Sequence, residues 1–157
     1  MTDYPAPVVL ENIRTNAKNC IPRHLESRYS IQGHEWGDLS STSDFATKDA
    51  HRFTRILAAD CYWMAGEHLN LVHSMLHFLA LDPGGRVFAI GGFHTGRAKL
   101  AAFFDVAVDE GLTVEEVYEE DADGVRRAWM KERDGGMEDV LGRKRWLVIA
   151  RLKRRLL

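Results

Sequence analysis

Phe53-Thr54-Arg55-Ile56-Leu57-Ala58-Ala59-Asp60-Cys61-Tyr62-Trp63 is the stretch of sequence around which the rest of the chain is organised. Its first half is an apolar run too short for a helix, and it ends in an acid, which is typical of a buried parallel strand. In open α/β sheets, ligands bind just past the carboxyl ends of such strands, so Asp60 lies where chemistry is expected. Two large rings directly after a strand cannot both enter one core. At least one of Tyr62 and Trp63 is therefore expected to line a cleft.

The composition is that of an ordinary globular domain. The chain has 157 residues, of which 45% are hydrophobic and 28% charged, and its net charge of −2 gives no electrostatic reason to expect a nucleic-acid partner. Cys20 and Cys61 do not form a disulfide framework. No apolar run reaches the length of a membrane span, and the first residues lack the features of a signal peptide. We therefore expect a single domain over residues 1–157 that is cytoplasmic (cytosolic or nuclear) and has no membrane partner.

The residues before this stretch predict one helix and one short strand. Pro5 and Pro7 suit the first turn of a helix, where a missing N–H is tolerated, and Pro22 ends that helix. Tyr29–Gln32 is a strand candidate, and Ser40–Asp44 is expected to be a polar loop.

After this stretch, helices and strands alternate. Glu67–Leu81 has helical periodicity, with Leu69, Val72, Leu76 and Leu79 expected on the core face and Asn70, His73, Ser74 and His77 on the polar arc. A turn leads to a strand over Arg86–Ile90, and a third helix is expected before Gly111. The remaining expected elements are a strand over Leu112–Tyr118, a long connection over Glu119–Lys144 and a buried strand over Arg145–Leu152.

This alternation predicts an α/β fold with a parallel sheet, closed by an antiparallel hairpin that carries a large insertion.

Histidines and basic residues give weaker signals. His73 and His77 have a spacing that suits a metal site, but no carboxylate or cysteine matches them, so solvated surface histidines are the better interpretation and no metal is expected. The hypothesis of a metal-dependent hydrolase that uses His73, His77 and His94 rests on the number of histidines alone. The basic end Lys153-Arg154-Arg155 lacks interleaved aromatic residues, and we interpret it as a frayed terminus with no nucleic-acid partner.

The loop Gly91-Gly92-Phe93-His94-Thr95-Gly96 stands between a strand and a helix, where phosphates are often bound. It does not match the dinucleotide fingerprint because Phe93 occupies the place of the second glycine. The loop is expected to line a cleft at the carboxyl edge of the sheet.

Seven motifs are similar in type and order to those of a known family. They are Thr2-Asp3-Tyr4-Pro5, Val9-Leu10-Glu11-Asn12-Ile13, Gly33-His34-Glu35-Trp36-Gly37, Leu57-Ala58-Ala59-Asp60-Cys61, Ser74-Met75-Leu76-His77-Phe78-Leu79, Leu81-Asp82-Pro83-Gly84-Gly85-Arg86-Val87 and Gly92-Phe93-His94-Thr95-Gly96-Arg97. The chain thereby resembles the class I S-adenosylmethionine-dependent methyltransferases, and among these the fungal nicotinamide N-methyltransferase-like proteins. That group includes methyltransferases that act on the N-terminus and a lysine of translation elongation factor 1-alpha.

The resemblance implies S-adenosylmethionine as the cofactor and three residues that contact it. Asp3 matches the acid that binds the ribose hydroxyls, Trp36 a tryptophan near the adenine, and Ala59 a small residue close to the cofactor. An acid suits a diol, and an indole suits a planar base. Methyl transfer needs a neutral amine held in line with the methyl group. Asp60 is the residue expected to orient the amine, with Tyr62 and Trp63 as the pocket wall; a structural acid bonded to backbone N–H groups is an equal alternative for Asp60.

The chain departs from the family at its front, because the glycine-rich cofactor loop of the family precedes the Thr-Asp-Tyr-Pro motif and no Gly-x-Gly occurs here. The expected fold is therefore an incomplete seven-stranded Rossmann-like methyltransferase sheet that lacks its first strand and most of its second. With Asp3 on a terminal, unpaired segment, we expect weak cofactor binding.

Two functions follow from the resemblance. The first is an N-methyltransferase, in a truncated form, that acts on a protein such as a translation elongation factor or on a small nicotinamide-like amine. The second is an inactive, methyltransferase-like partner subunit, because an exposed strand edge would offer another chain a place to pair.

Overall fold

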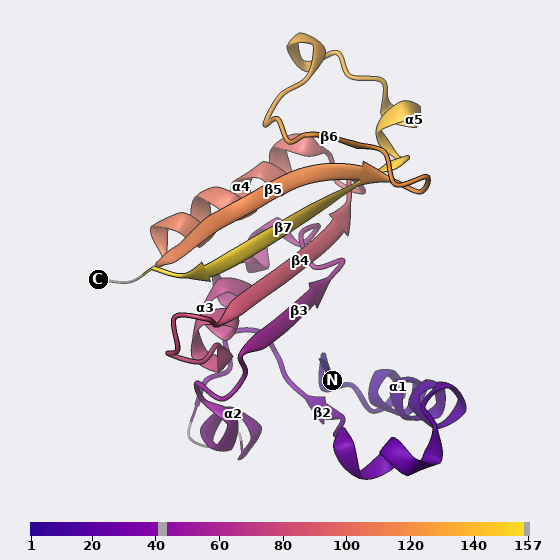
Figure 1. Ribbon diagram of the computed structural model, residues 1–157, viewed down its shortest axis with the longest axis vertical. Helices are drawn as coiled ribbons and strands as arrows, with labels where there is room; N and C mark the ends of the chain where they lie inside the picture. The colour runs from indigo at the N-terminus through magenta and orange to yellow at the C-terminus, as the bar shows by residue number, and fades with distance from the viewer. Residues whose placement is uncertain (41–43, 156–157) are drawn as a thin grey trace.

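Five strands form a mixed sheet in the computed structural model, which describes residues 1–40 and 44–155 (Figure 1). In sheet order they are β3 (Arg55–Ala59), β4 (Arg86–Gly92), β7 (Trp146–Arg154), β5 (Leu112–Asp121) and β6 (Arg126–Ala128). β3 and β4 are parallel, whereas β7 runs antiparallel to both β4 and β5. The α/β class and the closing antiparallel pair are thus confirmed.

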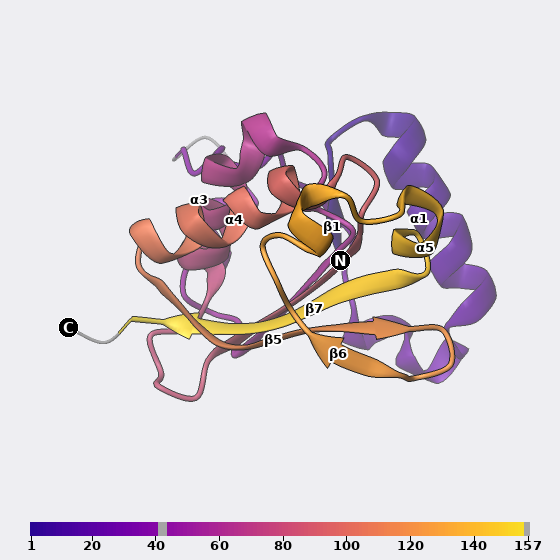
Figure 2. The same cartoon turned by 90° about the horizontal axis from the view of Figure 1, so that it is seen from above.

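Two helices pack on the same face of this sheet (Figure 2). α3 (His68–Phe78) follows a short 3-10 turn, η2 (Ala65–Glu67), and α4 (Arg97–Asp109) follows β4. The core between helices and sheet is built from alternate strand residues and one stripe of each helix. Its members include Val87, Ala89, Val148, Ala150 and Leu152 from the strands and Leu71, Met75, Leu100 and Phe103 from the helices. Each large buried side chain stabilises the fold by about 1.5–3 kcal/mol.

The opposite face of the sheet is not covered by a helix in the described residues (Figure 2). We call it the open face and define it by its apolar residues, which are Leu57, Ala59, Phe88, Ile90, Leu147 and Ile149. In the strand register, Leu57 lies beside Phe88, and Ala59 beside Ile90 and then Ile149. Leu57 is 76% exposed.

The N-terminal residues form a small unit at the side of the sheet (Figure 1). It comprises β1 (Thr2–Asp3), α1 (Pro7–Cys20), a 3-10 helix η1 (Arg23–Arg28) and β2 (Gln32–Gly33). The helix begins at Pro7 and ends before Pro22, as predicted. β1 and β2 pair in parallel. Gly33 permits the close approach of β2 to Pro5, because a Cβ there would lie 2.8 Å from the Pro5 side chain.

Several local predictions were wrong. The strand predicted at Tyr29–Gln32 is displaced to β2, and α2 (Asp44–Asp49) follows the predicted polar loop, whose residues 41–43 lie outside the described residues. On α3, Leu69 is exposed and Ser74 is buried. Ser74 is drawn inward because its hydroxyl accepts the Gly37 N–H and bonds to the His34 ring, both at 2.9 Å.

The second half of the chain also holds more structure than predicted. The connection after Glu119 contains the end of β5, then β6, a 3-10 turn η3 (Asp134–Gly136) and α5 (Val140–Arg143). The expected frayed basic end is wrong, because β7 continues to Arg154. The Arg154 guanidinium donates to the carbonyl of Leu79 at 3.0 Å. No helix in the described residues is long and apolar enough to cross a membrane.

Candidate functional site

The carboxyl ends of β3 and β4 lie side by side, and Asp60 stands directly at this point. Its N–H donates to the Ile90 carbonyl at 2.6 Å and closes the ladder between the two strands. Its backbone then turns into the left-handed region, with φ of 54°. Such a conformation is uncommon outside glycine, and strained residues of this kind cluster at functional sites.

The Asp60 carboxylate is largely open to solvent. The side chain is 58% exposed, and its Oδ1 lies 3.5 Å from the His94 Nε2. The same oxygen accepts the Gly92 N–H at 3.4 Å, a long and therefore weak hydrogen bond. The carboxylate therefore has acceptor capacity left for a ligand.

The two aromatic residues after Asp60 separate as the sequence requires, one inward and one outward. Tyr62 is only 1% exposed, and its ring packs 4.7 Å from that of Phe103. Gly91 makes room for it, because a Cβ there would lie 2.8 Å from the Tyr62 ring. Trp63 is 47% exposed. The structure therefore places Tyr62 in the core and not on an accessible wall, because the ring fills the space between the sheet and α4.

Asp3 acts electrostatically on Cys61, the second residue after β3. Burial raises the pKa of the Cys61 thiol to about 11, and the negative charges of Asp60 and Asp3 add to this effect. Asp3 pairs with Gly33 in β1–β2, so the expectation of an unpaired segment was wrong. One Asp3 carboxylate oxygen, Oδ1, accepts the Tyr4 N–H at 2.7 Å.

The other two predicted cofactor residues lie in different surroundings. Trp36 is half-buried against the main core, in a loop fixed to α3 through Ser74. Ala59 is exposed on the open face. These residues fit the nucleoside half of S-adenosylmethionine chemically, since a small exposed residue at the strand end admits a ligand and two carboxylates offer acceptors for hydroxyl groups.

The three histidines of the hydrolase hypothesis each have a different partner. His73 Nε2 lies 2.7 Å from the Glu110 carboxylate, and His77 Nε2 lies 2.8 Å from the Ala46 carbonyl. His94 faces Asp60. Within residues 1–40 and 44–155, no group of three or more histidine, cysteine or acidic residues could hold a metal ion.

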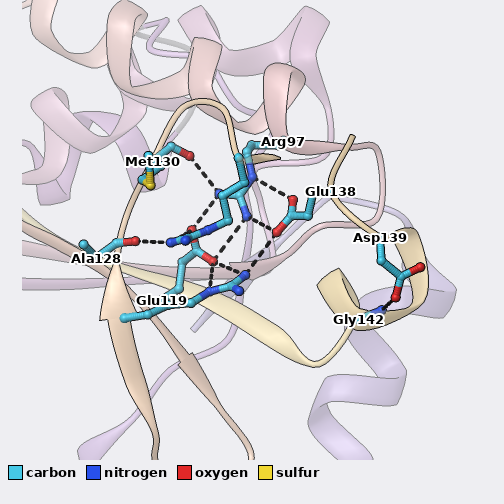
Figure 3. A network of polar contacts seen from close by, with 9 residues as sticks. Arg97, Glu119, Ala128, Met130, Glu138, Asp139 and Gly142 are labelled. Carbon is cyan, nitrogen blue, oxygen red and sulfur yellow. Dashed lines mark hydrogen bonds and ion pairs between the residues drawn. The ribbon is translucent and has the colours of Figure 1, made fainter. Parts of the chain in front are cut away.

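A buried ion-pair network lies beyond the Gly91–Gly96 loop and was missed by sequence reasoning (Figure 3). Arg97, at the start of α4, donates to both oxygens of Glu119 (2.6 and 3.2 Å) and both oxygens of Glu138 (2.9 and 2.6 Å). The Arg127 guanidinium lies 2.6 Å from the Glu119 carboxylate, and the Arg133 guanidinium lies 3.4 Å from the same carboxylate.

Through Arg97, the network binds the segment after β6 at Met130 and Glu138. Arg97 directly follows the Gly91–Gly96 loop, so this segment lies beside the loop that contains His94. Alternation from Leu112 and Val114 would turn Glu119 outward, and a bulge between Val114 and Glu116 reverses this, so the sequence pattern gave no signal for its burial.

The guanidinium of Arg97 also contacts two aromatic rings. Its central carbon lies 4.4 Å from the centre of the Phe93 ring and 5.2 Å from that of Trp129. The two rings are nearly parallel. This packing shields the ion pairs from water, which strengthens them.

The sequence is similar to methyltransferases. No family model matches the chain. The protein N-terminal and lysine N-methyltransferase efm7 of Schizosaccharomyces pombe is 30% identical over 147 residues, which cover 88% of this chain and 53% of the relative. The protein of the same name from Aspergillus fumigatus is 30% identical over 146 residues, with the same two coverages. The chain spans about half the length of these curated relatives.

Solved structures show the same fold. The PH0226 protein from Pyrococcus horikoshii OT3 superposes with a TM-score of 0.59 at 10% identity, over 98% of this chain and 70% of that one. A protein assigned as a sarcosine dimethylglycine methyltransferase from Galdieria sulphuraria gives 0.62 at 9% identity, over 98% and 68%. The chain therefore has a Rossmann-like methyltransferase fold and is related in sequence to methyltransferases.

Proposed function

We propose that this chain forms the substrate-side part of an S-adenosylmethionine-dependent N-methyltransferase that acts on an amine of a protein. The observation that carries the proposal is the match along 88% of the chain to a relative named as a protein N-terminal and lysine N-methyltransferase. The relatives' names favour a protein amine over a nicotinamide-like small molecule. A translation elongation factor as the substrate and a cytoplasmic location belong to the same proposal.

Asp60 has the position and the acceptor capacity to orient an amine. S-adenosylmethionine supplies an activated methyl group, so the protein has to present an amine lone pair and exclude water. An exposed carboxylate at the ends of two parallel strands accepts an N–H of the amine and fixes the direction of its lone pair. The exposed Trp63 ring offers a face for the cationic product.

The cofactor side of the proposal rests on Asp3, Trp36 and Ala59. Asp3 and Asp60 both lie close enough to Cys61 to raise its pKa, so two acids border the end of β3. Ala59 leaves that strand end uncovered. We assign Asp3 to the ribose hydroxyls, Trp36 to the adenine side and Ala59 to close approach of the cofactor.

A chimera tests this function. The matched part of the S. pombe relative is replaced by this chain, and methyl transfer to a peptide with a free N-terminus and one lysine is followed by mass spectrometry. We expect methylation, and we expect Asp60→Asn to lower kcat/KM by about 10- to 100-fold, because it removes a charge-assisted hydrogen bond of roughly 1.5–3 kcal/mol.

Asp109→Asn is the matched control, since Asp109 is an exposed acid at the far end of α4. It should leave kcat/KM unchanged. A folded chimera that binds the cofactor but methylates neither the α-amine nor the lysine would overturn the proposal. Equal activity of the Asp60→Asn variant would remove Asp60 from its proposed role.

A further inference from the structure

His94 and Asp60 face each other at the carboxyl ends of β3 and β4. Asp60 directly follows β3, and His94 is the second residue after β4. The His94 Nε2 lies 3.5 Å from the Asp60 Oδ1, and the two side chains are 64% and 58% exposed. The pair can therefore be reached both by a substrate and by solvent.

The position of the His94 ring is set by the backbone beside it. A Cβ at Gly92 would lie 3.1 Å from the His94 Nε2, which is closer than ordinary van der Waals contact. The absence of a side chain at Gly92 thus lets the ring approach the end of β4. Arg97, which begins α4, is bound to Glu138 and to the Met130 carbonyl, so the loop that contains His94 is also held at its other end.

Asp60 is the charged group that faces the His94 ring. Arg97 is the next charged residue along the chain, but its guanidinium is turned inward and lies 2.6 Å from both Glu119 and Glu138. In residues 1–40 and 44–155, no ion pair other than the one with Asp60 includes His94. An imidazolium formed at His94 would thus have a carboxylate beside it, which stabilises its charge.

Methyl transfer to an amine first requires that the amine lose a proton. At pH 7.5, a lysine amine with an ordinary pKa of about 10.4 is neutral in roughly one molecule in a thousand, and an α-amine with a pKa of about 8 in roughly one in four. A carboxylate attracts the cationic amine but is a weak base at this pH, whereas imidazole takes up a proton in the neutral range. Asp60 and His94 together therefore offer an anchor and a proton acceptor.

We propose that His94 is a further catalytic residue, which accepts the proton that the target amine has to lose. The inference rests on the proposed N-methyltransferase function and extends it. The cationic amine binds with one N–H on the Asp60 carboxylate and another on the His94 imidazole. Transfer of the second proton leaves a neutral amine and an imidazolium, and rotation about the C–N bond of the amine turns the freed lone pair toward the methyl group.

The atoms and charges of this step balance. The cofactor supplies the methyl group, whose C–S bond breaks with its electron pair left on sulfur, while the amine lone pair forms the new N–C bond. The product amine carries one positive charge again. The imidazolium of His94 returns its proton to solvent through its exposed side.

The chimera of this chain with the S. pombe relative tests the proposal with two peptides, one with a single lysine and an acetylated N-terminus and one with a free N-terminus and no lysine. With the natural chain, kcat/KM for the lysine peptide should be nearly constant between about pH 7.5 and 9.5, because the cationic amine is the form that binds. His94→Gln should lower this kcat/KM by about 100-fold at pH 7.5, and the value should then rise about tenfold per pH unit, because only the neutral amine can react. For the α-amine peptide, His94→Gln should cost less than about tenfold at pH 7.5, because more of this amine is already neutral.

His73→Gln is the matched control, because His73 forms the same kind of pair with Glu110 at the opposite end of α4 from the loop. It should leave both pH profiles unchanged. A second variant, Gly92→Ala, keeps the imidazole but crowds its ring, and should lower kcat/KM for the lysine peptide at pH 7.5 by about tenfold. Calorimetry should give the same dissociation constant for S-adenosylmethionine in the chimera with and without His94→Gln.

Three results would overturn this inference and leave the proposed function standing. The first is an unchanged kcat/KM of the His94→Gln variant on the lysine peptide at pH 7.5. The second is a loss that is equal at every pH, and the third is a kcat/KM of the natural chain that already rises tenfold per pH unit. A folded, cofactor-binding chimera that methylates neither peptide would overturn the proposed function and this inference together.

Discussion

The Tyr62 side chain ends in a hydroxyl that lacks a hydrogen-bond partner among the described residues, although the residue is buried. Burial raises the pKa of this phenol, and Cys61 adds a smaller effect in the same direction, so the group stays neutral. A buried polar group without a partner carries a desolvation cost of about 1–3 kcal/mol. The hydroxyl therefore weakens the fold, whereas the ring stabilises it.

We accordingly expect Tyr62→Phe to leave the free energy of unfolding unchanged or raise it by up to about 1 kcal/mol, measured by chemical denaturation. Tyr118→Phe serves as the control, since Tyr118 is a half-buried strand residue whose ring contacts Arg126. In the chimera, Tyr62→Phe should retain methyl transfer. A loss of activity with unchanged stability would return Tyr62 to the pocket wall.

At the scale of elements, the Arg97 network joins α4, β5 and the segment that leads to α5. Glu119 is fully buried, and burial alone would raise its pKa. The hydrogen bonds and charges of Arg97 and Arg127 outweigh that effect and hold the pKa of Glu119 below its ordinary value of 4.5. Hydrogen bonds from Arg97 lower the pKa of Glu138 in the same way.

A depressed carboxyl pKa makes stability depend on pH in a defined direction. The contribution of Glu119 is fully present above its unfolded pKa, near 4.5, and is lost as the pH falls through the lower folded value. We expect Glu119→Gln to cost about 3–5 kcal/mol at pH 7 because it leaves Arg97 buried with one partner fewer. It should also flatten the decline of stability below pH 4.5. Denaturant titrations at several pH values measure both effects.

Glu116→Gln is the matched control on the same strand. Its ion pair with Arg151 is solvent-exposed, so it should cost at most about 1 kcal/mol. If the two variants were equally stable, the buried network would have no special role in holding the insertion.

Periodicity and turn residues were sufficient to predict the long elements. The predicted bounds lie near the observed ones for six elements, which are α1, α3, α4, β3, β4 and β7. The misses have two physical causes. Ser74 is buried through a contact with His34, a distant part of the chain. Arg126–Ala128 forms a short local hairpin with the end of β5, and its charged residues give no strand pattern in the sequence. For the site, the position of Asp60 was predictable, but the inward turn of Tyr62 required knowing where α4 packs.

At the scale of the whole molecule, tight cofactor binding requires a rigidly held Asp3 together with a glycine-rich loop. Asp3 lies on a two-residue strand whose only partner in the described structure is β2, and no Gly-x-Gly loop occurs in the sequence. Loss of one charge-assisted hydrogen bond to the cofactor weakens the binding free energy by roughly 1.5–3 kcal/mol. We expect calorimetric titration of the isolated chain with S-adenosylmethionine to show no micromolar dissociation constant.

The same titration on the chimera is the informative comparison, because the remaining part of the S. pombe relative should tighten cofactor binding. A one-to-one micromolar isotherm with the isolated chain would contradict this prediction. It would mean that the N-terminal unit is already held rigidly enough to anchor the ribose.

The position of β7 has a consequence for the order in which the molecule can form. β7 follows all the other strands in the sequence, yet it lies in the sheet between β4 and β5. While the ribosome is still making the chain, β4 and β5 therefore lack the strand that pairs with both of them. Each of the two then exposes an unpaired edge. The nascent protein must keep these edges apart until residues 146–154 leave the exit tunnel, which makes this sheet a candidate for help from chaperones during translation.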